Sequence, residues 1–161
     1  MGKWTILVLR VVIALALAGS LLVQFVMMPV IWADLEGAED WARGLFIAIL
    51  VLGIVTMQVS AVCIWQLLTM VRRGSVFSSA AFRYVDVIIG AVAAASVLAF
   101  LLAVLLAPGE VAPGIVGLIC GASLVIAGIA LLVYVMRMLL AQAVAREAEA
   151  KRLRSELDEV I

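Results

Sequence analysis

Histidine is absent from this 161-residue sequence, cysteine occurs only twice, and charged residues make up only 14% of it. Without an imidazole, the chain lacks the usual general base, the usual zinc ligand and a Cys–His nucleophile. Cys63 and Cys120 lie in different apolar runs, and expected positions near opposite ends of their helices separate them by roughly 20 Å. A disulfide needs Cα atoms within about 7 Å of each other. We therefore expect a protein that is not an enzyme, with no cofactor, no metal site and no disulfide.

Apolar residues are abundant instead: 68% of the chain is hydrophobic, and its mean hydropathy is +1.32. Soluble domains average about 45–50% apolar residues, and a small domain cannot hide such an excess from water. Four runs are long enough to cross a bilayer, which takes about 20 residues. A lone strand would leave its backbone unpaired in lipid, so these runs predict helices. The predicted fold is an all-α membrane protein, a four-helix bundle over 1–140 with spans at about 9–33, 44–71, 84–107 and 115–140, followed by a charged helix over 141–161.

Short connections between the runs predict that consecutive helices are antiparallel neighbours. Basic residues near the ends of spans mark the cytoplasmic side. In this sequence they gather in three places: Lys3 and Arg10; Arg72, Arg73 and Arg83; and Arg137, Arg146, Lys151, Arg152 and Arg154. The first connection is acidic, with Asp34, Glu36, Glu39 and Asp40 against Arg43. We therefore expect a multi-pass protein of the cell (cytoplasmic) membrane with both termini and the middle connection on the cytoplasmic side.

The middle connection contains the stretch RRGSVFSSAAFR, residues 72–83. Gly74 is placed to close the last turn of the second span, and Ser78 has the identity of an N-cap residue for the third. Phe77 and Phe82 then have the spacing of a hydrophobic staple, with a ligand contact by the two rings as the alternative. The arginines suit anionic lipid headgroups, and three arginines in a short loop do not favour direct nucleic-acid binding. The candidate residues of this hairpin are Arg72, Arg73, Gly74, Phe77, Ser78, Phe82 and Arg83.

The four-span size, the cytoplasmic termini and the arginine-rich G-x-x-F-S/T hairpin resemble the YoaS-like family of small bacterial membrane proteins of unknown function. The likeness covers the whole chain in topology, and in residues it rests mainly on Gly74, Phe77 and Ser78. Members of that family often have small helix-turn-helix regulators of the Cro/repressor type as genomic neighbours. The resemblance therefore implies such a regulator as a cytoplasmic partner, and it implies no activity and no catalytic residue.

Small residues recur at helical spacing in the last three runs. Lipid tails are as apolar as leucine, so membrane helices associate through close packing of small side chains. Gly117 and Gly121 form a GxxxG sequence, and Gly128 continues the stripe. We interpret these residues as packing within one four-helix bundle, with a homo-oligomer seam along the fourth run as the alternative. The candidate packing residues are Gly53, Ser60, Gly90, Gly117, Gly121 and Gly128.

Polar groups inside the runs are few. Gln24, Gln58 and Gln66 are the largest. Asp86 lies near the cytoplasmic end of the third run, three residues after Arg83, where a local ion pair is expected. Because ionisable groups inside a span mark ion and proton routes, their scarcity does not favour an ion-coupled transporter.

Residues 141–161 are rich in good helix formers and predict a helix that continues into water. Opposite charges stand four residues apart at Glu147 and Lys151, at Arg152 and Glu156, and at Arg154 and Asp158. Leu153, Leu157 and Val160 lie on or near one stripe that is too short for a firm coiled-coil prediction. One interpretation is a solvated helix on the bilayer surface, and the other is a docking or self-association surface.

These observations favour an interaction protein over a catalyst. The predicted function is to regulate or anchor a cytoplasmic partner at the membrane through the tail and the middle connection, with membrane lipids and a second copy of the chain as further partners. The alternative is a small transporter or channel subunit that oligomerises through its glycine-rich helix faces.

Overall fold

The computed structural model describes residues 3–34, 39–72, 79–109 and 111–158, and these ranges are almost entirely helical. The elements follow in the order α1 (Lys3–Leu22), a π-helical turn η1 (Val23–Met27), α2 (Met28–Asp34), α3 (Asp40–Arg72), α4 (Ser79–Leu106) and α5 (Pro113–Asp158). Because α1, η1 and α2 are continuous, the chain forms four long helical segments. All four are long and apolar enough to cross a membrane, at Ile6–Asp34, Asp40–Met70, Ala81–Leu106 and Pro113–Ser155. The protein is therefore a membrane protein of all-α fold.

Local sequence explains where several of these helices begin and bend. Asp40 lies in the first turn of α3, where a carboxylate interacts favourably with the helix dipole. Pro113 is the first residue of α5, a position where the missing N–H costs nothing. The π-helical turn ends at Met27, two residues before Pro29, which has no N–H to offer the carbonyl of Phe25. The break in the regular ladder of the first span therefore has a local cause.

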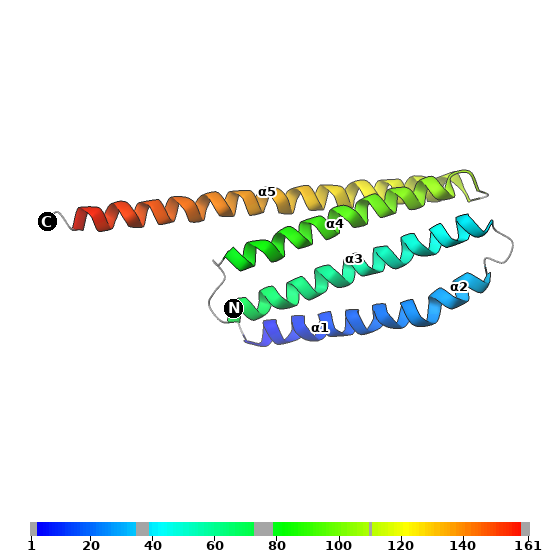
Figure 1. The fold of residues 1–161 in the computed structure, drawn as a ribbon, viewed down its shortest axis with the longest axis horizontal. Helices are drawn as coiled ribbons and strands as arrows, with labels where there is room; N and C mark the ends of the chain where they lie inside the picture. The colour runs from blue at the N-terminus through cyan, green and yellow to red at the C-terminus, as the bar shows by residue number, and fades with distance from the viewer. Residues whose placement is uncertain (1–2, 35–38, 73–78, 110, 159–161) are drawn as a thin grey trace.

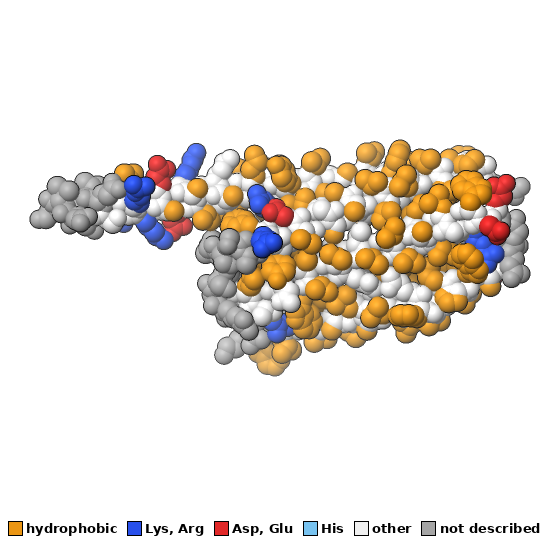
Figure 2. Space-filling view, viewed as in Figure 1, with side chains coloured by type: hydrophobic (Ala, Val, Ile, Leu, Met, Phe, Trp, Pro, Cys, Tyr) orange, Lys and Arg blue, Asp and Glu red, His pale blue; other side chains and the backbone are white. Residues whose placement is uncertain are grey.

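The helices lie in a row. The main contacts follow chain order, α1 with α3, α3 with α4, and α4 with α5, and α2 adds a smaller contact with α3. Figure 1, viewed down the shortest axis of the molecule, shows the same single layer. The predicted four-helix bundle is therefore wrong in its packing, because the described helices do not close around a common core. Lipid offers no hydrophobic gain for closing such a layer, and the broad face seen in Figure 2 is largely covered by apolar side chains.

Most buried side chains are small. Ala103 of α4 is 0% exposed. Ser96 Oγ of α4 donates a hydrogen bond to the Ser123 carbonyl of α5 at 2.8 Å, and Ser123 Oγ donates to the Cys120 carbonyl at 2.9 Å. Because Ala103 lies seven residues after Ser96, on the same face of α4, both residues mark the side of α4 that approaches α5. The buried residues of the described part are Ile13, Ile49, Cys63, Ala81, Ser96, Ala103, Ser123 and Ala130.

The glycines named from the sequence occupy a different environment. An added Cβ would meet no heavy atom within 4 Å at Gly53, Gly90, Gly117, Gly121 or Gly128. Ser60 donates to the Thr56 carbonyl of its own helix at 2.9 Å. Within one chain, none of these glycines is needed to admit a neighbouring helix. The homo-oligomer seam along α5 stays a prediction.

Candidate functional site

The candidate functional site is the end of the molecule where α3 ends, α4 begins and α5 extends past its neighbours (Figure 1). Of the predicted hairpin residues, Arg73, Gly74, Phe77 and Ser78 lie outside the described residues. Arg72 is the last residue of α3. The structure thus places Phe82 and Arg83 in the first turns of α4, while the predicted cap and staple involve residues beyond its described part.

Arg137 of α5 joins the two last helices at this end. Its Nη2 lies 2.7 Å from Asp86 Oδ2 of α4, and its guanidinium carbon lies 5.7 Å from the centre of the Phe82 ring. The predicted local pair between Asp86 and Arg83 is therefore wrong, because Asp86 pairs with a cation 51 residues away. Sequence spacing reveals only neighbours on one helix, and this partner comes from the next one. Phe82 thus has an aromatic role beside Arg137 that the staple did not suggest.

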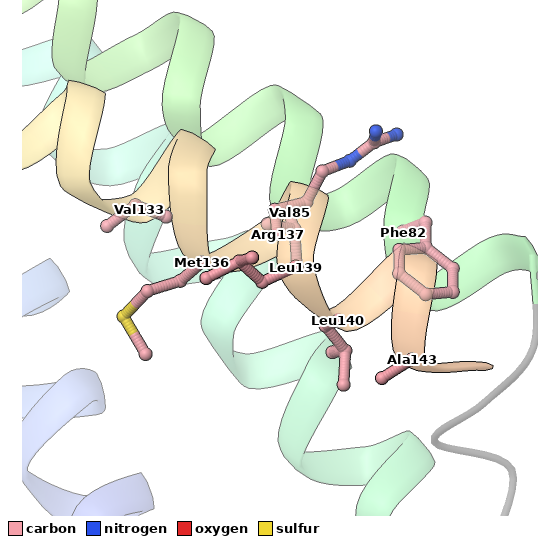
Figure 3. A pocket seen from close by; sticks show the side chains of 8 residues that line it. All are labelled: Phe82, Val85, Val133, Met136, Arg137, Leu139, Leu140 and Ala143. Carbon is pink, nitrogen blue, oxygen red and sulfur yellow. The ribbon is translucent and has the colours of Figure 1, made fainter. Parts of the chain in front are cut away.

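An open apolar cavity of about 570 Å³ lies between α4 and α5 beside this pair. Figure 3 shows Phe82 and Ala143 at one end of the cavity and Val133 at the other, with the guanidinium of Arg137 directed away from Met136 and Leu140. The wall is therefore almost entirely hydrocarbon, while the charge lies at its edge. Such a wall suits an acyl chain or an apolar side chain and offers no group for acid–base chemistry.

A second arginine joins α1 to α3 in a similar way. Arg10 Nη2 donates a hydrogen bond to Thr69 Oγ1 at 2.9 Å, and its guanidinium carbon lies 5.3 Å from the Trp65 ring centre. Arg43 stacks on Trp32 at 4.0 Å near the first connection. Arginine over an aromatic ring thus recurs at the helix ends, an attraction of about 0.5–1 kcal/mol at exposed sites. The sequence placed these arginines near the ends of spans but could not reveal the rings that they contact.

The last part of α5 projects beyond the other helices (Figure 2). Lys151 Nζ lies 2.8 Å from Glu147 Oε1, which confirms this predicted pair. Leu153 is 55% exposed. Nothing is described of the side chain of Leu157, and Val160 lies outside the described residues. The described tail is therefore a charged helix with an exposed leucine.

No group of three or more histidine, cysteine, aspartate or glutamate side chains in the described ranges could hold a metal ion. The arrangement therefore offers contact surfaces: an apolar wall, arginines at helix ends and a projecting charged helix.

Comparison with known proteins places the chain in one family. Residues 31–161 match the model of a family described as "Protein of unknown function (DUF2975)". The matched region includes α3, α4 and α5. No curated protein and no solved structure matches the chain. The expectation of a family of unknown function agrees with this match, although the match carries neither the YoaS-like name nor its hairpin motif.

Proposed function

The chain belongs to the DUF2975 family, and we propose that this member is a non-catalytic, multi-pass membrane protein that regulates or anchors a cytoplasmic partner protein. The partner would contact the projecting tail of α5 and the neighbouring ends of α3 and α4. A helix-turn-helix regulator is the class of partner that the resemblance to the YoaS-like family implies.

The proposed arrangement is antiparallel, with both termini on the cytoplasmic side of the cell membrane. Contacts whose residue numbers run in opposite directions along paired helices support it. Between the first two spans, Arg10 contacts Thr69 and Ser20 contacts Gln58. Between α4 and α5, Asp86 contacts Arg137 and Ser96 contacts Ser123. Charge supports the orientation. Arg10, Arg83 and Arg137 lie at the end of the molecule where α3 ends and α4 begins. Asp34, Glu39 and Asp40 lie at the opposite end. Basic residues mark the cytoplasmic ends of spans.

The observation that carries the proposal is the length of α5. It is one helix of 46 residues, whereas α4 has 28. Residues 141–158 alone add about 27 Å at 1.5 Å per residue. A hydrocarbon core of about 30 Å needs only about 20 residues, so the excess length with its charges belongs in water. A solvated helix with an exposed leucine is suited to a protein partner.

Charge composition also favours a protein partner over a lipid surface. Arg146, Lys151, Arg152 and Arg154 stand among Glu147, Glu149 and Glu156, whereas helices that bind anionic lipid are strongly basic on their polar face. A channel would need several copies of the chain, because a single row of helices encloses no path.

Co-purification of the full chain in mild detergent tests the proposal. Three chains are compared: the full chain, a chain that ends at Leu140, and a chain whose residues 141–161 are scrambled. The scrambled tail keeps composition, charge and helix propensity, so it separates a specific surface from a merely charged one. We expect one protein in stoichiometric amount with the full chain, lost from both variants. Absence of any stoichiometric partner of the full chain, or equal capture by the scrambled tail, would contradict the proposal.

A further inference from the structure

Three polar side chains meet near the middle of the first two spans. Gln58 Nε2 of α3 donates hydrogen bonds to Ser20 Oγ of α1 and to Gln24 Oε1 of η1, each at 3.0 Å. Ser20 Oγ itself donates to the Leu17 carbonyl at 2.8 Å. The spans run Ile6–Asp34 and Asp40–Met70, so the cluster lies close to the level of the bilayer centre.

The cluster leaves one amide nitrogen and one amide oxygen without a hydrogen bond in the described structure. The amide nitrogen of Gln58 donates to two acceptors, and its Oε1 has no hydrogen bond in the described structure. Gln24 accepts through Oε1, and its Nε2 has no partner among the described residues. In hydrocarbon, an unpaired polar group costs several kcal/mol. The spare amide groups of Gln24 and Gln58 are therefore expected to find a partner inside the membrane.

The surroundings of the cluster are open and apolar. Val55 and Val62 lie three residues before and four residues after Gln58, which places them on the same face of α3, and both are exposed. Leu21 of α1 is exposed as well. Because α1 has its main contact with α3 alone, this seam lies at the edge of the row. A transmembrane helix can therefore approach it directly.

We propose that a second copy of this chain covers the seam, with Gln24 Nε2 of each copy donating to Gln58 Oε1 of the other. A two-fold axis makes such an interface self-complementary, since residue i contacts residue j and residue j contacts residue i. Here one spare donor and one spare acceptor on the same seam meet the condition. Both copies then satisfy their amides without any other molecule, and Leu21, Val55 and Val62 cover the hydrogen bonds. This interface differs from the glycine stripe of α5, which lies at the other edge of the row.

Energy transfer between fluorescently labelled full-length chains, measured in phosphatidylcholine vesicles over a range of protein-to-lipid ratios, tests the proposal. The variants Gln24→Met and Gln58→Met keep side-chain length and remove the amide. Each removes both hydrogen bonds of a two-fold dimer, so we expect dimerisation about tenfold weaker. The double variant should be no weaker than either single one, because the same bonds are lost. The matched control is Gln66→Met, the same change on α3 outside the cluster, and it should dimerise like the wild type.

Helix content by circular dichroism is measured for each variant, so that loss of fold is separated from loss of dimerisation. Energy transfer in the wild type that stays at the level expected for random encounter at every protein-to-lipid ratio would overturn the proposal. So would an equal loss in Gln66→Met, or two single losses that add in the double variant. The proposal would also be overturned if a different protein occupied the seam while the Gln24→Met and Gln58→Met variants remained dimeric.

Discussion

The α4–α5 seam and the α1–α3 seam both contain polar side chains, but the residue types differ and so does the result. Between α4 and α5, Ser96 donates to the backbone of the facing helix and Ala103 is fully covered. Between α1 and α3, Gln58 is bonded on one side of its amide only. A short hydroxyl can satisfy itself on a backbone carbonyl, whereas an amide brings both a donor and an acceptor. Small polar residues therefore close a seam within one chain, and glutamines leave it able to bind another helix.

The largest expected loss of stability comes from enlarging a buried side chain of α4. Ala103→Leu adds three carbons where the side chain is 0% exposed, and overpacking of this kind costs about 1–3 kcal/mol. The measurement is unfolding by SDS titration in mixed micelles, followed by circular dichroism. Ala94→Leu is the matched control on the exposed side of α4. Equal stability of the two variants would contradict the close packing ascribed to this region.

A smaller effect is expected for Arg137→Met at the same seam. The variant loses the ion pair with Asp86 and the contact with Phe82. Because Asp86 is about half exposed, water weakens the pair, and we expect a loss of about 1 kcal/mol. The same SDS titration measures it. If Asp86→Asn loses as much stability as Arg137→Met, and the double variant loses no more than either, the ion pair accounts for the loss. If the two losses add in the double variant, the two side chains are not coupled.

The smallest effect is expected for Arg10→Met at the α1–α3 seam. Arg10 bonds the hydroxyl of Thr69 and faces Trp65, and no carboxylate of the described residues pairs with it. We expect a loss of about 0.5 kcal/mol, mainly from the ring contact. Thr69→Val should then give a smaller loss in the same titration. A loss for Arg10→Met larger than that for Arg137→Met would reverse the comparison of the two seams.

The positions of the spans could be predicted, because the length of each apolar run alone determines where the chain can cross a bilayer. The expected span at 84–107 corresponds to Ala81–Leu106, and the one at 44–71 to Asp40–Met70. The fourth span was expected to continue as a charged helix, and α5 does continue without a break to Asp158. Partition between lipid and water depends on composition along the chain, which the sequence displays directly.

Packing could not be predicted in the same way. In lipid, side chains that face a neighbouring helix and side chains that face acyl chains are equally apolar, so periodicity does not separate them. Glycine spacing suggested close approach, yet the covered positions proved to be Ala103, Ser96 and Ser123. The partners of Arg137 and Gln58 lie on other helices, and no rule of spacing within one helix could find them.

After Gly128, α5 contains neither glycine nor proline up to its last described residue. Kinks in helices arise mainly at such residues, so this stretch has no point at which it would readily bend. A pull or tilt applied near Ser155 would therefore be transmitted along this stretch to Arg137, which contacts Asp86. A binding event in water would in this way change the angle of a helix inside the bilayer.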